Sequence, residues 1–308
     1  MNNKIVSVSP HIRSKVSTST IMRDVLIALC PALIAGIIIF GVRALAVAAV
    51  CVGTAVFFEW AFEKICKRPN TVGDLSAAVT GLLLALNLPV DIPFWQAAFG
   101  SLVAIVVVKQ LFGGIGYNFA NPAITARIVM LIAFSGTMTT WAIPNFADAV
   151  SSATPLVALK AGAADATIGQ LFLGTVGGCL GETSALALLI GGIYLLAKKV
   201  ITWHAPVAFI GTVFVLSLIK GGFGFAVAEI FAGGLFLGAF FMATDYVTTP
   251  STKWGRLIFG IGCGLITCLI RFFGNYPEGV SFSILFMNIL TPYISKWTAT
   301  KPLGGAKI

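Results

Sequence analysis

Charged side chains are scarce in this 308-residue chain, and their scarcity excludes an ordinary soluble protein. Only 10% of the residues are charged, 58% are hydrophobic, and the mean hydropathy is +0.97. Soluble domains carry about 25% charged residues. The composition therefore predicts an all-α polytopic membrane protein surrounded by the lipid bilayer, rather than two soluble domains of the same total length.

Sequence patterns that bind metals, nucleotides or nucleic acids are also missing. With only two histidines, His11 and His204, a histidine-based metal site is not expected. The six cysteines form no CxxC pair and most lie in apolar runs, which favours a packing role and excludes iron–sulfur spacing. No dinucleotide-binding glycine pattern is present. The net charge of +9 is scattered between apolar runs, so we expect no nucleic-acid partner.

Long apolar runs dominate what remains, and several approach the roughly 20 residues that a bilayer requires. Ten spans are predicted, at Val25–Gly41, Ala44–Phe62, Leu75–Leu88, Phe94–Leu111, Ala123–Phe134, Ser184–Ala197, His204–Ile219, Ala226–Ala243, Leu257–Arg271 and Val280–Ser295. The predicted organisation is a polar arm (1–24), a first membrane half of five spans (25–135), a polar loop (136–181), a second half of five spans (182–295) and a tail (296–308). Within the loop, the weaker apolar stretch Ile168–Leu180 is either a re-entrant half-helix or the packed end of the loop.

Lysine and arginine are distributed unequally between the two sides of this ten-span scheme. Basic residues prefer the cytoplasmic side of a membrane protein. With the N-terminus inside, the outer segments hold Arg43, Lys160, Lys220 and Arg271, Arg127 lies within a span, and the other fifteen basic residues, Lys109 among them, fall inside. The asymmetry predicts that both termini are cytoplasmic and that the 136–181 loop faces outward.

An internal repeat is suggested by three matches that share one offset. They are Gly73–Ser76 with Gly181–Ser184, Trp95 with Trp203, and Gly113–Gly116 with Gly221–Gly224. Three predicted spans separate the copies, and an odd number of spans inverts the topology of the second copy. Inverted repeats build binding sites near their shared interface, often with broken helices.

The segment Asp148–Pro155 is the most distinctive part of the polar loop. Thr is a good helix N-cap and Pro is favoured at the first helical position, so Thr154 is predicted to cap a short helix over Leu156–Lys160. A phosphate esterified to a capping hydroxyl would meet free backbone N–H groups. Ser151 and Ser152 would add donors, whereas Asp148 would repel a phosphate and suits a modifying enzyme or a metal better.

The same segment resembles a recognition motif for covalent attachment of FMN to threonine through a phosphodiester. The matching residues are Asp148, Ser151, Ala153 and Thr154, followed by Pro155, while Ala149 and Ser152 depart from the glycines that are common there. Further stretches, Ser9–His11, Gly116–Ala123, Gly181–Ser184 and Ala243–Pro250, are similar to signatures of one family, the RnfD/NqrB family. Its members serve either the Rnf complex or the Na⁺-translocating NADH:quinone reductase, and the short N-terminal arm favours the Rnf branch.

The resemblance implies an electron-carrying subunit with covalent FMN on Thr154, attached by a flavin transferase on the outer side. It also implies partner subunits, namely an outer-side FMN subunit and iron–sulfur membrane subunits, in a complex that couples electron flow between ferredoxin and NAD⁺ to Na⁺ or H⁺ translocation. Because this chain lacks the corresponding motifs, NAD and ferredoxin would bind elsewhere in that complex.

Some relatives in this family hold a second, non-covalent riboflavin on the inner side. Two loops that are predicted to lie on that side carry polar residues able to hydrogen-bond a flavin edge, namely Asn118, Asn121, Thr244, Asp245 and Thr248. The alternative is helix capping and turn formation, since Asn121-Pro122 starts a span and Thr249-Pro250 breaks the chain.

Acidic residues at span ends offer an ion path. Asp74 and Glu182 occupy matching positions of the proposed repeat, where carboxylates either handle Na⁺ or protons or simply cap helices. Arg127, within a span, requires a partner, either a carboxylate or an anionic flavin.

A flavin-free channel or secondary transporter is the alternative function, because an inverted repeat with broken segments suits that class equally well. The Asp148–Thr154 segment discriminates between the two hypotheses, since a transporter has no need of it.

Overall fold

The computed structural model describes residues 16–142, 155–160, 167–182, 184–274 and 278–300, and within these ranges all regular structure is helical. η1 is a 3₁₀-helix, and η2 and η3 are π-helices. The elements are α1 Thr18–Phe40, α2 Val42–Ile65, η1 Val72–Asp74, α3 Ser76–Leu86, α4 Phe94–Leu102, η2 Val103–Gln110, α5 Pro122–Ala133, α6 Ser135–Met138, α7 Pro155–Lys160, α8 Ile168–Leu173, α9 Ala185–Ala197, α10 His204–Phe231, α11 Leu235–Leu237, η3 Gly238–Met242, α12 Lys253–Phe273 and α13 Val280–Trp297.

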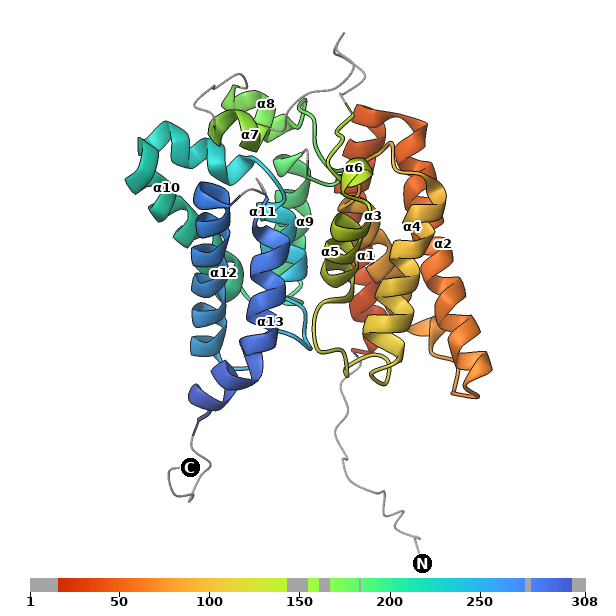
Figure 1. Ribbon diagram of the computed structural model, residues 1–308. Helices are drawn as coiled ribbons and strands as arrows, with labels where there is room; N and C mark the ends of the chain where they lie inside the picture. Colours follow the sequence, from red (N-terminus) through yellow and green to blue (C-terminus); the bar gives the residue numbers. More distant parts are fainter. Residues whose placement is uncertain (1–15, 143–154, 161–166, 183, 275–277, 301–308) are drawn as a thin grey trace, which may run out of the picture.

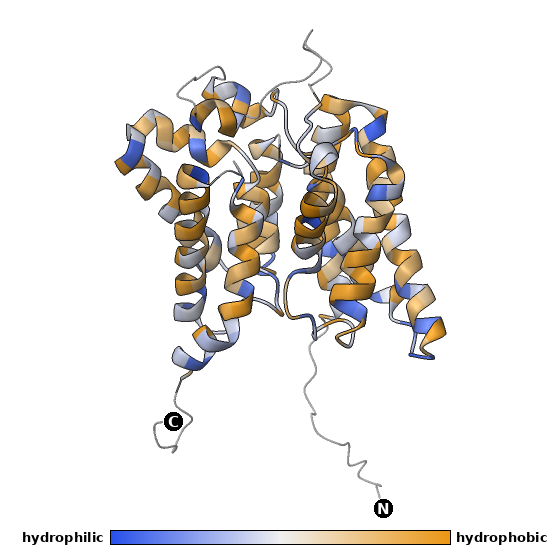
Figure 2. Ribbon diagram, in the orientation of Figure 1, coloured by the Kyte–Doolittle hydropathy of each residue, from blue (hydrophilic) through white to orange (hydrophobic). Residues whose placement is uncertain are grey.

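Four of these helices, α1, α2, α10 and α12, are long and apolar enough to cross a membrane. The shorter apolar helices of the bundle include α3, α4 with η2, α5 and α9. Figure 2 shows hydrophobic residues along the length of the helices, with hydrophilic residues mainly near the ends and connections. The predicted all-α polytopic membrane fold is therefore confirmed.

The bundle consists of two halves, α1–α5 and α9–α13, that lie side by side (Figure 1). Across the boundary, α1 packs on α9 and α5 packs on α13. Within the halves, α2 contacts α3 and α4 just as α10 contacts α11 and α12. The start of α1 and the end of α13 lie at one end of the bundle, the lower end in Figure 1, and α7 and α8 lie at the other.

Corresponding helices of the two halves run in opposite directions, so the arrangement is an inverted repeat. Its register differs from the one that the three sequence matches suggested. The packing relates α3 to the segment α11–η3, whereas the matches relate α3 to α9. Glycines are common at turns, and tryptophans are common near helix starts. The matched residues share one offset by chance and do not lie on equivalent helices of the two halves.

Both related segments are interrupted spans. α3 has eleven residues and α11–η3 has eight, which correspond to roughly 16 Å and 12 Å of helix, about half of a bilayer core. The predicted span Ala226–Ala243 is thus wrong in its first part, because α10 continues to Phe231 after a break at Gly222. The chain then turns at Gly233, whose φ of +77° favours glycine, and helix resumes at Leu235.

The first helix also begins earlier than the apolar run that predicted it, at Thr18 rather than Val25. Ser17 caps it, with its hydroxyl oxygen accepting from the Thr20 N–H at 3.3 Å. Asp24, which the pattern placed outside the span, is accommodated within the helix because the Tyr194 hydroxyl donates to it at 3.2 Å.

Close packing of α1 on α9 depends on Gly191. A Cβ at this position would lie 2.0 Å from the Ala28 carbonyl oxygen, which belongs to the backbone of α1. We expect Gly191→Ala to lower the unfolding free energy by about 1–3 kcal/mol, because the helices must separate. Thermal unfolding of the detergent-purified chain measures the effect.

Gly211→Ala is the matched control, because a Cβ there meets no atom within 4 Å. It should be neutral or stabilising by up to about 1 kcal/mol through helix propensity. Equal melting temperatures for the two variants would show that α1 and α9 do not pack as described.

Candidate functional site

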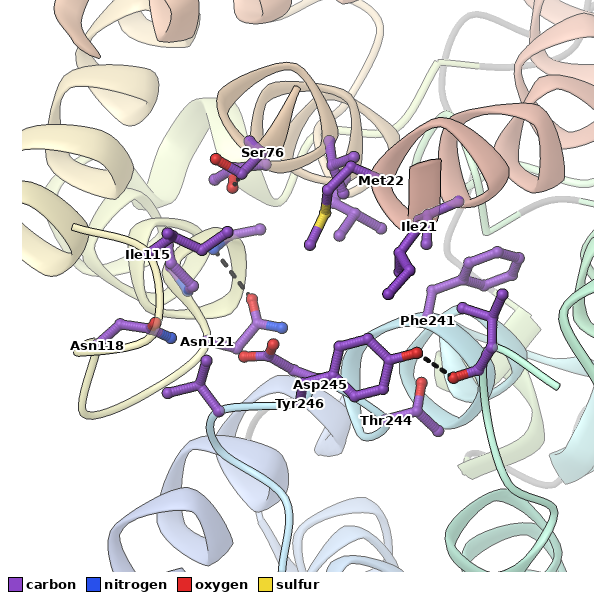
Figure 3. Close-up of a pocket in the computed structure, with 18 of the residues that line it drawn as sticks. Ile21, Met22, Ser76, Ile115, Asn118, Asn121, Phe241, Thr244, Asp245 and Tyr246 are labelled. Atoms are coloured by element: carbon purple, nitrogen blue, oxygen red, sulfur yellow. Dashed lines mark hydrogen bonds between the residues drawn. The ribbon is translucent and has the colours of Figure 1, made fainter. Parts of the chain in front are cut away.

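A cavity of about 390 Å³ opens between the two halves, near the start of α3 and the end of η3. Its walls come from α1, α3, η2, the segment 115–123, the end of α9 and the segment 240–247. Figure 3 shows Met22 and Ser76 on one wall and Asn121, Asp245 and Tyr246 on the other. Because α3 and the segment α11–η3 are both half-length, their ends leave room that continuous spans would fill.

One wall of the cavity is polar and is built by two loops. Asn121 caps α5, with its side-chain oxygen accepting from the N–H of Ala123 at 3.1 Å. Its amide nitrogen donates to the Met242 carbonyl at 3.3 Å, which ties α5 to the end of η3. Beside it, enclosure by protein raises the pKa of Asp245, while hydrogen bonds from Thr248 and Asn118 act in the opposite direction.

The opposite wall contains a buried ion pair. Lys109 is carried by the π-helix η2, whose wider turn is often found at functional sites. Its ammonium donates to Glu59 at 2.5 Å and to the Ser76 hydroxyl at 2.6 Å. Gln110 donates to the same Glu59 oxygen at 2.8 Å. A fixed cation therefore faces the cavity from the side opposite Asp245.

The remaining lining is mostly apolar, and includes Ile21, Val79, Leu83, Phe240 and Phe241. A cavity with apolar faces and a few convergent polar groups is typical of a small-molecule site. The arrangement suits a flat, largely apolar ring system with a hydrogen-bonding edge. It suits a phosphate poorly, because the Asp245 carboxyl stands among the polar groups.

Four of the five residues predicted for a second flavin are brought together here. Asn118, Asn121, Thr244 and Asp245 line the cavity, whereas Thr248 lies behind it and donates to Asp245 at 3.1 Å. The capping alternative is also correct for Asn121, whose side chain caps α5 and lines the cavity. Sequence reasoning missed Lys109 and Ser76, which lie on other elements and were brought near only by the fold.

The predicted attachment segment falls largely outside the described residues. This applies to Asp148, Ser151, Ser152, Ala153 and Thr154. Pro155 is described and opens α7, so the predicted short helix is confirmed. α7 lies at the end of the bundle opposite the start of α1 (Figure 1).

The apolar stretch Ile168–Leu180, also in this loop, forms only the six-residue helix α8 at its start. A capping box between Thr167 and Gln170 begins it and Gly174, in the left-handed conformation, ends it. The stretch is therefore not one continuous half-helix.

Asp74 and Glu182 are not brought together. Asp74 accepts from the Ser76 N–H at 2.7 Å at the beginning of α3, so the capping alternative holds for it. Glu182 follows Gly181, whose N–H donates to the Leu86 carbonyl at the end of α3. The length of α3, roughly 16 Å, thus separates the two carboxylates.

Two kinds of partner were predicted for Arg127, a carboxylate or an anionic flavin, and the structure shows a carboxylate. Arg127 donates to Glu278 through both terminal nitrogens, at 3.0 Å for one of them. It also donates to Asn87 at 2.7 Å and to the Cys179 sulfur at 3.4 Å. No local pattern marks these partners, because Glu278 follows Arg127 by 151 positions.

Comparison with known proteins gives consistent relatives over the whole length. The profile of the NQR2, RnfD, RnfE family matches residues 5–304. The chain is 49% identical to the D subunit of the Na⁺-translocating ferredoxin:NAD⁺ oxidoreductase complex of Acetobacterium woodii, over 99% of this chain and 97% of the relative. It is 44% identical to the D subunit of the proton-translocating ferredoxin:NAD⁺ oxidoreductase complex of Clostridium ljungdahlii, over 97% and 96%. It is 40% identical to the D subunit of the ion-translocating oxidoreductase complex of Stutzerimonas stutzeri, over 94% and 92%.

Proposed function

Because this chain belongs to the NQR2, RnfD, RnfE family, we propose that it is a membrane electron-transfer subunit of an Rnf-type complex. Such a complex would couple electron flow between reduced ferredoxin and NAD⁺ to ion translocation. Similar relatives carry both Na⁺- and proton-translocating names, so the proposal covers either ion. Ferredoxin, NAD⁺ and iron–sulfur sites would belong to partner subunits, since this sequence has none of their motifs.

The first cofactor in this proposal is FMN, esterified to Thr154. The supporting observation is the sequence Asp148–Thr154, which resembles the attachment motif at Asp148, Ser151, Ala153 and Thr154, followed by a helix that begins at Pro155. A flavin transferase on the outer side of the cytoplasmic membrane would modify this segment, with both termini on the inner side. Ser151 and Ser152 would donate to the phosphate, and Asp148 would serve recognition by the transferase.

The second cofactor is a riboflavin in the cavity between the half-helices. Asn118, Asn121 and Thr244 would hydrogen-bond the ring edge, and the apolar walls would cover its faces. Riboflavin fits better than FMN because it lacks a phosphate, which the Asp245 carboxyl would repel. Lys109 would stabilise negative charge gained on reduction. When bound, the flavins supply one-electron chemistry, and the protein sets their position and potential.

The observation that carries the proposal is the placement of the two features at opposite ends of one bundle. The cavity lies near the start of α1, at the lower end of the bundle in Figure 1, and α7 lies at the other end. A flavin at each place would provide an entry and an exit for electrons across the membrane.

Mass spectrometry and acid extraction test both cofactors in one preparation. We expect the intact chain, co-expressed with its flavin transferase, to carry the added mass of one phosphodiester-linked FMN. Acid treatment should release riboflavin and leave FMN on the protein. An unmodified mass together with an empty extract would contradict the proposal.

Filling the cavity should remove the second flavin alone. Val79 lines the cavity from α3, and Val79→Phe would project a ring into the space of the bound ring system. We expect extractable riboflavin to fall at least about tenfold, which corresponds to 1.4 kcal/mol of lost affinity. The control is Val215→Phe, on the exposed side of α10, which should retain riboflavin. Equal riboflavin in both variants would place the second flavin elsewhere.

The alternative of a flavin-free channel or transporter has one observation in its favour. The inverted repeat and its interrupted helices α3 and α11–η3 are features that secondary transporters share. A preparation that contains no flavin but retains the cavity would favour this alternative.

A further inference from the structure

A group of buried charges lies where the two halves meet, away from the cavity described above. Arg127 comes from α5 in the first half, Glu278 lies two residues before α13 in the second, and Cys179 and Glu182 lie between α8 and α9. One ligand atom from each of Cys179, Glu182 and Glu278 lies within 4.8 Å of the others. Arg127 donates to Glu278 and to Cys179.

The start of α11 is inserted between these carboxylates. A Cβ at Gly233 would lie 3.3 Å from a Glu182 oxygen, and a Cβ at Gly234 would lie 2.7 Å from a Glu278 oxygen. On the other side, the Gly181 N–H donates to the carbonyl of Leu86 at the end of α3. The group therefore contacts the ends of both interrupted spans.

The charges of this group do not balance. Arg127 is matched by Glu278, and Arg271 is matched by Glu229, to which it donates at 2.8 Å. Among the residues that the structure describes here, three carboxylates thus face two guanidinium groups. The excess negative charge belongs to Glu182.

Glu182 also has an unsatisfied atom. The residue is 9% exposed, and its Oε2 is buried without a hydrogen-bond partner in the described part of the chain. An unpaired buried charge is strongly unfavourable. Binding a proton would remove this unpaired charge.

We propose that Glu182 is a proton-binding site at the interface of the two halves, and that it exchanges one proton with solvent. On binding, a proton from water forms an O–H bond at the Glu182 carboxylate, and no group is oxidised or reduced. A proton suits the site better than a larger cation because Arg127 already occupies the Glu278 oxygens and the Cys179 sulfur. The site consists of this chain's own residues and does not depend on a flavin at Thr154.

Infrared spectroscopy of the purified full-length protein tests the proposal through the C=O stretch of the protonated carboxyl group. We expect a carboxyl band at neutral pH that disappears as the pH is raised. Glu182→Gln should abolish this band, and Glu182→Asp should retain a titrating band at a shifted position. Glu63→Gln is the control and should leave the band unchanged, since Glu63 is also buried but accepts from Thr71 outside this group. Persistence of the band in Glu182→Gln would overturn the proposal.

Thermal unfolding against pH supplies a second measurement that does not depend on band assignment. The unfolded chain exposes Glu182 to water, where a glutamic acid titrates near about 4.3, so a proton bound in the folded chain is released on unfolding above this pH. The melting temperature of the wild type should therefore fall as pH rises above this value and then level off. In Glu182→Gln, which mimics the neutral form, this part of the decrease should vanish. Parallel curves for the two proteins would contradict the proposal.

Discussion

Replacing Thr154 with alanine is expected to remove all covalently bound flavin from this chain. A phosphodiester requires a side-chain hydroxyl, and alanine has none. The protein is co-expressed with its flavin transferase, denatured in SDS and separated on a gel, where covalent flavin fluoresces as a band at the mass of the chain. The wild type should fluoresce and Thr154→Ala should be dark at equal protein loading.

Two control variants make the result specific to the attachment point. Ser152→Ala retains the Thr154 hydroxyl and should remain fluorescent, because alanine is as small as serine at a position where the motif usually has glycine. Thr167→Ala removes a helix-capping hydroxyl near the same end of the bundle and should also remain fluorescent. A fluorescent Thr154→Ala band would show that another residue carries the flavin, and a dark wild type would remove the main support for the redox function.

Local sequence signals were sufficient for the class of fold and for part of the candidate site. Hydropathy predicted an all-helical membrane bundle, because apolar length is a property of each segment alone. Asn118, Asn121 and Asp245 were recognisable because they interrupt apolar runs at loops that the topology places on one side. The cavity confirms that these loops meet, since all three residues line it.

These local signals did not predict which residues pair when they lie far apart in the sequence. Lys109 and Arg271 were counted among the charges that set topology, whereas both side chains are buried in ion pairs, with Glu59 and Glu229. A basic residue near a span end has the same local pattern whether it reaches water or a carboxylate on another helix. The register of the repeat failed for a similar reason, because it is defined by which helices pack together.

Breaking the Lys109–Glu59 pair is expected to cause a large loss of stability, because both side chains are almost completely buried. Their side chains are 4% and 0% exposed, and the ammonium lies 2.5 Å from the Glu59 Oε1. Lys109→Met retains the approximate shape of the side chain but leaves the carboxylate with Gln110 as its remaining donor among the described residues. The second oxygen of Glu59 is already buried without a described partner. Breaking a buried pair in this way destabilises a protein by about 3–5 kcal/mol.

Equilibrium unfolding in mixed detergent, followed by tryptophan fluorescence, measures this loss against two further variants. Lys109→Met/Glu59→Leu removes both charges and should recover most of the stability, since replacing a buried pair by apolar residues is often neutral. Arg43→Met breaks the Arg43–Asp91 pair, whose side chains are 49% and 60% exposed, and should cost at most about 1 kcal/mol. If Lys109→Met were no more destabilising than Arg43→Met, the ammonium would not be buried against Glu59. If the double variant were as unstable as the single one, the loss would come from packing around η2 rather than from an unpaired charge.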